Sequence, residues 1–359
     1  MTKLNLALVF GGRSPEHEVS LMSARGIHEH LDQGRFDILL VGVDRRGKPR
    51  LGGAELLEGA MDRGAGTPVR WPASPEDRTL RAEADGSVIS PPVDVLFPIV
   101  HGAGGEDGTI QGVCELAGIA CVGAGVLGSS LAMDKELSRT LLRAEGFPVV
   151  QSVVLRPSDL KDARVPAERV AALGYPVFVK PARAGSSVGI TRVADAKDLP
   201  RAIDDARAFD SKLVVERAVV EPREIEVSVL GADDPRASVP GEVVPAGEFY
   251  DYHAKYEAPD SRLLIPAPID DELSERIRGL ATRGFRALDL AGMARVDFLL
   301  SKRDGSLVLN EINTLPGFTP ISMYPRLWEA SGLSYGKLLE SLVEIAVEQA
   351  SLTPLAQQP

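Results

Sequence analysis

Apolar runs and amphipathic segments alternate along the first third of the chain. They follow in the order strand 4–10, helix 19–31, strand 36–43, strand 93–100, helix 109–117 and strand 119–122. A strand–helix–strand order of this kind predicts a doubly wound, Rossmann-like α/β domain over residues 1–128. Residues 50–92 interrupt the order with Gly, Pro and charged residues of weak periodicity, so we interpret them as a variable insertion without a catalytic role.

The middle of the chain changes pattern. A helix is predicted over residues 131–145, with Ser129 or Ser130 as its N-cap, and it carries Lys135, which by itself would be read as a surface residue. The apolar strand 175–181 contains Lys180 near its end, and a lysine there is costly unless its charge meets a partner.

The segment after this strand is rich in small residues and leads into another strand. Its backbone N–H groups, the hydroxyls of Ser186 and Ser187 and the nearby Lys180 form a predicted anion cradle. It lacks the G-x-x-x-x-G-K pattern and joins two strands, which argues against a Walker A loop. The alternative is an ordinary flexible hairpin.

Two apolar runs near the C-terminus, 294–300 and 307–313, flank Asp304-Gly305 and predict a β-hairpin. If the loop has three residues and ends at Gly305, Asp297 lies opposite Glu311 and Arg295 opposite Asn313, all on one face. A two-residue loop would separate the two carboxylates, so the sequence predicts a three-residue or another odd-length loop.

Opposed carboxylates repel each other, and the apolar neighbours indicate that this hairpin is buried. A buried acidic pair needs a cation. Because Asp, Glu and Asn supply hard oxygen ligands, we predict that Asp297, Glu311 and Asn313 bind Mg²⁺ or Mn²⁺, with phosphates completing the coordination. The alternative is a solvated polar face.

Other segments carry candidate chemistry with open alternatives. Glu16 begins a helix after a double glycine, where it either favours the helix dipole or anchors a substrate ammonium group. His101 follows a buried strand in a glycine-rich loop, where it either takes part in ligand binding, as residues at this edge of open α/β sheets do, or is a hydrogen-bonded loop histidine. Glu216 and Glu224 are spaced to bind the base and ribose of a nucleotide, or are surface acids.

The most aromatic segment, 249–256, contains Lys255 and Tyr256 and resembles a lid over an anionic ligand. Residues 314–322 hold three prolines and one glycine, which predicts an irregular path with backbone N–H groups able to bind an oxyanion. Helices are predicted over 270–289 and 334–349.

Composition narrows the function classes. With 359 residues the chain suggests two or three domains, and its net charge of −11 argues against a nucleic-acid or membrane partner. The two cysteines, Cys114 and Cys121, fit buried thiols and not a disulfide framework. The N-terminus lacks a cleavage pattern and no stretch reaches a membrane-spanning length, so we expect a cytoplasmic protein.

Ordered motifs over about nine-tenths of the chain resemble the ATP-grasp ligases and, within them, the D-alanine–D-alanine ligase family. The motifs are Phe10 to Ser20, His101-Gly102, Gly105 to Gly112, Met133-Asp134-Lys135, Gly185 to Gly189, Tyr250-Asp251-Tyr252, Lys255-Tyr256, Asn310 to Thr314 and Pro316-Gly317, ending at Tyr324-Pro325. The resemblance implies a mixed α/β and α+β fold, in which the N-terminal Rossmann-like domain precedes a two-part ATP-grasp domain. Its predicted parts are 129–225, then 226–350 with a lid over 248–262, then a tail over 351–359.

The resemblance also implies an ATP-dependent reaction. ATP phosphorylates one D-alanine, and the amine of a second attacks the acyl phosphate, giving D-alanyl-D-alanine, ADP and phosphate for peptidoglycan. The implied nucleotide-binding residues are Lys135, Lys180, Ser186, Ser187, Glu216, Glu224, Lys255 and Asn310. The implied ligands of two magnesium or manganese ions are Asp297, Glu311 and Asn313. A homodimer is implied as the assembly.

The substrate residues are carried over in the same way. Glu16 resembles the anchor of the first substrate's ammonium group, and it resembles a partner of Ser186 and Tyr256 in a chain that fastens the lid. Arg295 and the Gly317 backbone resemble the groups that stabilise the tetrahedral intermediate. The implied substrate-binding residues are Glu16, His101, Lys255, Arg295, Ser322 and Met323, the last at a position that is often Leu.

Three alternatives remain to be weighed against this ligase. A relative that joins D-alanine to D-lactate would carry a histidine where this lid has Tyr256. A non-catalytic nucleotide-binding protein would keep the ATP-grasp fold and bind the nucleotide without catalysing the reaction. A nicotinamide-dependent oxidoreductase rests only on the first strand–helix–strand unit, and it lacks the G-x-G-x-x-G fingerprint.

Overall fold

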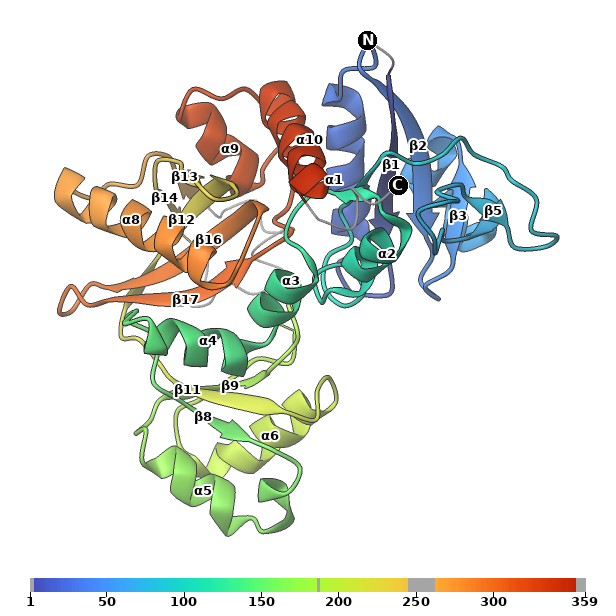
Figure 1. The fold of residues 1–359 in the computed structure, drawn as a ribbon. Helices are drawn as coiled ribbons and strands as arrows, with labels where there is room; N and C mark the ends of the chain where they lie inside the picture. Colours follow the sequence, from blue (N-terminus) through green and yellow to red (C-terminus); the bar gives the residue numbers. More distant parts are fainter. Residues whose placement is uncertain (1–2, 186–187, 245–261, 353–359) are drawn as a thin grey trace.

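The computed structural model describes residues 3–185, 188–244 and 262–352, which form three sheets with flanking helices (Figure 1). Ser186, Ser187, Lys255 and Tyr256 lie outside the described residues, as does the predicted lid apart from its last position. The fold is mixed α/β, as the sequence predicts.

The first sheet has the strand order β5-β4-β3-β2-β1-β6-β7, and β1 pairs in parallel with both β2 and β6. The predicted strand–helix–strand order is confirmed. The parallel part comprises β1 (Leu4–Gly11), α1 (His17–His30), β2 (Phe36–Val43), β6 (Val95–Pro98), α2 (Thr109–Ala117) and β7 (Ala120–Cys121).

The predicted insertion extends this sheet at one edge. It contributes antiparallel strands and two short 3₁₀ helices, namely β3 (Pro49–Gly52), η1 (Ala54–Glu58), η2 (Ala60–Arg63), β4 (Thr67–Arg70) and β5 (Arg81–Ala82). Its side chains also enter the core, because Leu56 and Met61 are buried beneath α1.

Helices cover both faces of the first sheet (Figure 1). The helix α2 packs on one face, whereas α1 and the C-terminal helix α10 (Tyr335–Leu352) lie side by side on the other. Leu315 and Phe318 belong to this same core. The segment that follows the predicted metal ligands is therefore packed directly against the N-terminal sheet.

The second sheet has the order β10-β9-β11-β8 and one helical layer. It is built from β8 (Ser152–Leu155), η3 (Asp159–Lys161), α5 (Arg164–Ala171), β9 (Val177–Pro181), β10 (Thr191–Val193), η4 (Ala196–Asp198), α6 (Leu199–Arg207) and β11 (Leu213–Arg217). The strands β9 and β10 are antiparallel neighbours, so the small-residue segment joins two paired strands, as the sequence predicts.

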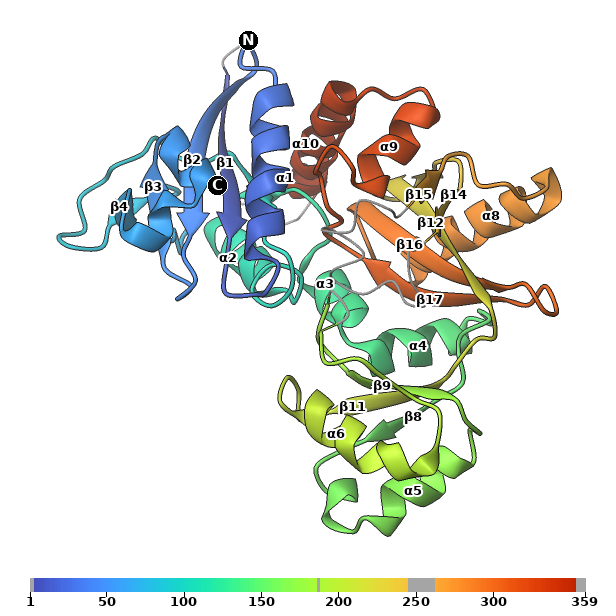
Figure 2. The same cartoon turned by 180° about the vertical axis from the view of Figure 1, so that it is seen from behind.

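The helix predicted over 131–145 is two helices, α3 (Val126–Met133) and α4 (Lys135–Ala144). The helix is interrupted at Asp134, whose carboxylate accepts hydrogen bonds from the N–H groups of Glu136 and Leu137. Asp134 is the N-cap of the helix that carries Lys135, and the predicted cap at Ser129 or Ser130 is wrong. Figure 2 shows α4 lying between the second and third sheets.

The third sheet has the order β15-β14-β12-β16-β17, with β13 paired to β12. One of its faces packs on α8 and is apolar. The C-terminal part comprises β12 (Pro222–Gly231), β13 (Arg236–Ala237), β14 (Gly241–Val244), β15 (Arg262–Leu264), α8 (Asp271–Ala287), β16 (Gly292–Ser301), β17 (Leu307–Asn313), α9 (Met323–Ala330) and α10.

The predicted hairpin register is confirmed, but the predicted loop length is wrong. Asp297 pairs with Glu311 and Arg295 with Asn313. The N–H of Ser301 bonds to the carbonyl of Ser306, which leaves a four-residue loop. A β-bulge at Asn310 adds one residue to β17 and returns both carboxylates to one face.

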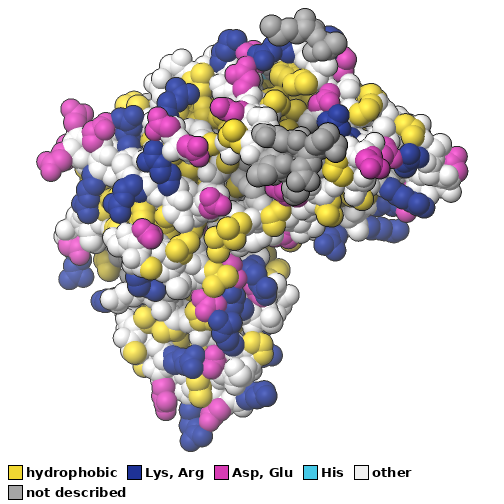
Figure 3. All heavy atoms as spheres, viewed as in Figure 1, with side chains coloured by type: hydrophobic (Ala, Val, Ile, Leu, Met, Phe, Trp, Pro, Cys, Tyr) yellow, Lys and Arg dark blue, Asp and Glu magenta, His cyan; other side chains and the backbone are white. Residues whose placement is uncertain are grey.

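The surface gives two further observations. Figure 3 shows basic and acidic side chains interspersed over all three parts of the face that it draws. Among the described helices, none combines the length and the apolar character needed to cross a membrane.

Candidate active site

Polar side chains form two rows across three neighbouring strands of the third sheet. The register aligns Glu226 of β12 with Asp297 of β16 and Glu311 of β17. The next row aligns Arg295 with Asn313. The alternate residues of these strands are buried against α8, so the sheet is apolar on one face and carries this polar surface on the other.

Arg295 is the positive centre of these rows. Its Nε and Nη2 atoms bind the two carboxylate oxygens of Asp297, each at 2.7 Å, and Nε lies 3.0 Å from Glu226. The side-chain amide of Asn313 donates to the same carboxylate at 2.9 Å. The arginine therefore offsets much of the repulsion that the sequence predicts among these acids.

The donor set fits a divalent cation. Asp297 and Glu311 are directly opposed residues, so their oxygens come from positions with Cβ atoms roughly 4.5–5.5 Å apart. The bulge residue Asn310 adds a buried side-chain oxygen that lacks a hydrogen-bond partner among the described residues. Oδ1 of Asp297 accepts one hydrogen bond from Arg295 and keeps a second lone pair, whereas Oδ2 accepts from both Arg295 and Asn313.

A cleft with roughly 750 Å³ of empty space, open to solvent, lies where the first and third sheets meet. It brings together many of the predicted substrate residues. Its lining includes Glu16, His101, Glu106, Arg295, Glu311, Asn313, Leu315, Gly317, Ser322 and Met323.

Two groups of the first sheet's loops define the charge of this cleft. Glu16 is the N-terminal residue before α1 and is buried at 8% exposure, yet its side chain does not cap the helix. Burial lowers the pKa of His101, which keeps its ring neutral at pH 7. Burial, and then the charge of Glu16, raise the pKa of Glu106 to about 8.

A second space, of about 450 Å³, adjoins the cleft. Its lining includes Lys135, Asn310 and Ala184, which follows β9. The two spaces share lining residues, namely Glu106, Gly185, Glu311 and Asn313. Two of the three predicted metal ligands therefore lie at their junction.

Lys135 ties α4 to the hairpin. Its N–H donates to the carbonyl of Ala182 at 3.0 Å, and its Nζ donates to the carbonyl of Ala184 at 2.6 Å. Burial lowers the pKa of this lysine, although the charge of Glu311 opposes the shift. The ammonium group of Lys135 is therefore held next to the predicted anion cradle.

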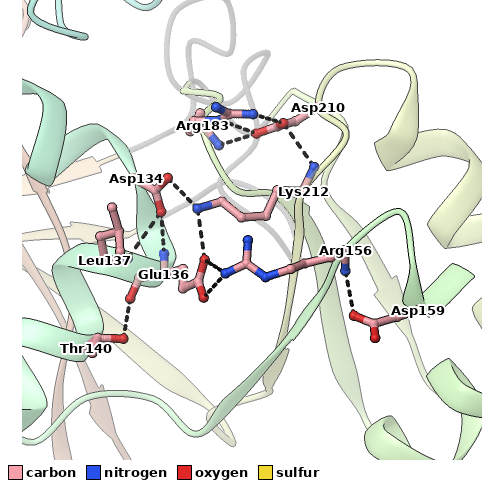
Figure 4. A network of polar contacts seen from close by, with 9 residues as sticks. All are labelled: Asp134, Glu136, Leu137, Thr140, Arg156, Asp159, Arg183, Asp210 and Lys212. Carbon is pink, nitrogen blue, oxygen red and sulfur yellow. Dashed lines mark hydrogen bonds and ion pairs between the residues drawn. The ribbon is translucent and has the colours of Figure 1, made fainter.

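Charged pairs join the hairpin, the start of α4 and the segment before β11 to one another (Figure 4). Lys212 binds Asp134 at 2.5 Å and Glu136 at 2.9 Å, both at the start of α4. The guanidinium of Arg183 pairs with Asp210 at 2.6 Å. The backbone around the cradle is thus anchored to α4 on one side and to the segment before β11 on the other.

Lys180 meets the charge partner that the sequence requires, and this partner is Glu216, whose burial rules out the alternative of a surface acid. Glu216 is 3% exposed and pairs with Arg139 at 2.6 Å and with Lys180 at 2.8 Å. Burial alone would raise the pKa of Glu216, but the two cations outweigh burial and lower it. Neither Lys180 nor Glu216 lines the two spaces, and the same holds for Asp297 and Glu224.

Replacing Arg139 with Met should destabilise the protein by about 3 kcal/mol, the low end for breaking a buried ion pair, because Lys180 still neutralises Glu216. Unfolding in urea measures the change. Arg156→Met is the matched control: its ion pair is exposed, and removing it should change stability by less than about 1 kcal/mol. Similar small losses in both variants would contradict a stabilising role for the buried pair.

The structure adds two acids to the predicted site residues. Glu226 contacts Arg295, and Glu106 lines both spaces. Glu226 could have been found from the alternation of Glu224, Glu226 and Ser228 with apolar residues in one strand. Glu106 carries no such signal, because its role depends on contacts with residues distant in the sequence.

Comparison with known proteins identifies the family. A family model described as "D-ala D-ala ligase N-terminus" matches residues 5–124, and one described as "D-ala D-ala ligase C-terminus" matches residues 141–344. The chain is 48% identical over 351 residues to a D-alanine–D-alanine ligase of Thermoanaerobacter sp. (strain X514), covering 97% of this chain and 98% of the relative. A ligase of the same name from Heliobacterium modesticaldum is 49% identical over 352 residues, covering 97% and 95%.

Solved structures agree with these relatives. The D-alanine–D-alanine ligase of Coxiella burnetii superimposes with a TM-score of 0.85 at 33% identity, covering 98% of this chain and 96% of the other. The VanG D-Ala:D-Ser ligase of Enterococcus faecalis superimposes with a TM-score of 0.86 at 35% identity, covering 96% and 100%. The predicted fold class is confirmed, and the chain belongs to the D-alanine–D-alanine ligase family.

Proposed function

We propose that this protein joins two D-alanine molecules in an ATP-dependent reaction that releases ADP and phosphate, as a step in making peptidoglycan precursors. The observation that carries the proposal is the junction of the two spaces at Glu311 and Asn313. One space presents Lys135 and the hairpin backbone to phosphates, and the other presents Glu16 and Arg295 to an amino acid.

The nucleotide side of the proposal rests on cations and backbone donors. Lys135, with Lys180 behind it, supplies positive charge next to the hairpin that would hold the phosphates. Two Mg²⁺ or Mn²⁺ ions, held by Asp297, Glu311 and Asn313, would neutralise charge on the phosphates. Glu216 and Glu224 remain proposed contacts of the base and ribose, and Ser186, Ser187 and Lys255 remain proposed phosphate contacts outside the described residues.

The substrate side follows from charge. Glu16 would bind the ammonium group of the first D-alanine, and the neutral ring of His101 lies in the same cleft. Arg295 and the N–H of Gly317 would stabilise the oxyanion formed when the second amine attacks the acyl phosphate. The carboxylate of the second D-alanine would lie near Ser322 and Met323, at the start of α9, where backbone N–H groups favour an anion.

The test is ADP release in the presence of single candidate substrates. We expect release with ATP and D-alanine, and none with L-alanine or D-lactate alone. In competition between D-alanine, D-serine and D-lactate at pH 7, the product should be mainly D-alanyl-D-alanine. A mainly depsipeptide product would favour the D-lactate ligase, and ADP release independent of any amino acid would favour a nucleotide-binding protein without this reaction.

Three further properties belong to this proposal. The predicted parts 1–128, 129–225 and 226–350 would act as one substrate domain and the two halves of the nucleotide grip, closed by Tyr256 of the lid. The protein would act in the cytoplasm, where ATP is available. It would assemble as a homodimer, which sedimentation at micromolar concentration would distinguish from a monomer.

A further inference from the structure

Two side chains of the loop between β6 and α2 hold one residue of the C-terminal part. The Nδ1 atom of His101 lies 3.0 Å from the carbonyl oxygen of Leu315, and the N–H of Leu315 donates to Glu106 at 3.4 Å. Because a carbonyl can only accept, Nδ1 of His101 carries the proton and donates it. More than 200 residues separate these partners in the sequence.

This grip fixes the direction of the chain toward Gly317. The N–H and the carbonyl of Leu315 belong to two successive peptide planes, so holding both restrains φ and ψ of Leu315. The next residue is Pro316, whose ring sets φ near −65°. Only ψ of Pro316 is then left to orient the N–H of Gly317.

The other side of Gly317 is held as well. The N–H of Phe318 donates to Oγ of Ser23 on α1 at 3.1 Å, and the hydroxyl of Tyr335 donates to the carbonyl of Phe318 at 2.7 Å. Ser23 is fully buried. Gly317 therefore lies between Leu315, which the loop after β6 holds, and Phe318, which α1 and α10 hold.

The position of Glu106 is electrostatically unfavourable, which makes its presence informative. Its carboxyl group lines the same cleft as Glu16, and burial together with the charge of Glu16 raises its pKa, so the ionised form of Glu106 costs free energy there. Apart from its contact with Leu315, it accepts a hydrogen bond from the N–H of Gly102 at 2.7 Å. An apolar side chain could fill this space without the repulsion, but it could not hold a backbone N–H.

We propose that Glu106, His101 and Ser23 are positioning residues that aim the N–H of Gly317 at the reacting carboxyl carbon through their bonds to Leu315 and Phe318. The inference rests on the proposed function, in which Gly317 stabilises the oxyanion. The N–H of Gly317 is then oriented correctly only when the N-terminal part of the chain is docked against the C-terminal part. His101 then has a role through the backbone in addition to its place beside the substrate.

The experiment compares steady-state kinetics of Glu106→Ala, His101→Ala and His101→Asn. The two alanine variants should lower kcat by about 10- to 100-fold, as a shift of the order of 1 Å does, while KM for ATP changes less than about twofold. Asparagine places its Nδ2 donor near the position of Nδ1 in histidine. His101→Asn should therefore recover kcat to within about threefold of the wild type.

Two further variants serve as controls. Asp107→Asn changes the acid next to Glu106, and it should leave kcat unchanged, because the side-chain carboxylate of Asp107 accepts hydrogen bonds from the nearby N–H groups of Gly104 and Thr109. Glu106→Gln keeps one acceptor oxygen in place of two, so its kcat should lie between those of Glu106→Ala and the wild type. This isosteric variant answers the question if Glu106→Ala does not fold.

The outcomes separate the inference from the proposed function. Wild-type protein without D-alanine-dependent ADP release would overturn the proposed function. Active wild-type protein with unchanged kcat in folded Glu106→Ala or Glu106→Gln would overturn the positioning role alone. A His101→Asn variant as slow as His101→Ala would likewise refute the backbone role of His101.

Discussion

Replacing Glu311 with Gln is expected to lower kcat by about 100- to 1,000-fold while leaving the protein folded. Glu311 lies where the phosphate space meets the substrate cleft, opposite Asp297 on the hairpin. The charge of Asp297 is already met by Arg295, so Glu311 supplies much of the negative charge available to a divalent cation. The amide keeps the shape of the side chain and removes this charge.

Coupled ADP-release kinetics over a range of Mg²⁺ concentrations measure the effect. The variant should require more Mg²⁺ for half-maximal rate, and its thermal unfolding should match the wild type. The control is Glu115→Gln, an exposed acid on α2 that lines neither space, which should behave as the wild type. A kcat within twofold of the wild type for Glu311→Gln would refute the metal assignment.

The hairpin that carries Glu311 shows what the sequence could and could not predict. Apolar alternation required Asp297 and Glu311 to share a face, and this conclusion holds. The loop length inferred from it was wrong, because a four-residue loop and a bulge at Asn310 give the same result as an odd-length loop. Burial of one face of the hairpin determines which residues of its two strands share that face. Several combinations of loop length and bulge give the same result.

The sequence predicts the helix that carries Lys135 but not its start, and the reason is local. Apolar residues continue with helical spacing through the break at Asp134, so periodicity predicts one helix. The residue that indicates the break is Asp134 itself, since aspartate is among the preferred N-caps of a helix. The break matters because it turns Lys135 into the first residue of a helix, where its side chain reaches the carbonyl of Ala184.

The sequence predicts some residues of the substrate cleft and not others. Residues named through motifs, among them Glu16, His101 and Gly317, line one cleft in the structure. Glu106 lies inside a motif, but its contact with Leu315 joins parts of the chain more than 200 residues apart. Periodicity and spacing report on neighbours in the sequence, and for this reason they are silent about such a contact.

Replacing Arg295 with Lys is expected to lower kcat by about 100-fold with little change in KM for ATP. The guanidinium holds Asp297 through two parallel bonds of 2.7 Å and still lies 3.0 Å from Glu226. Lysine keeps the positive charge but offers a single point of contact, so it cannot hold both acids while facing the cleft. The proposed oxyanion would then lose an oriented donor in the transition state, which affects kcat more than substrate binding.

The role of Glu226 can be separated by a double-mutant cycle. Glu226→Gln removes one acidic partner of Arg295 but leaves the bidentate pair with Asp297 intact, so its loss of kcat should be about tenfold smaller than that of Arg295→Lys. Because the two residues touch, the combined variant should lose less than the product of the single effects. Multiplicative losses would mean that Glu226 acts independently of Arg295, and a kcat within twofold of the wild type for Arg295→Lys would remove this arginine from the proposed transition-state contacts.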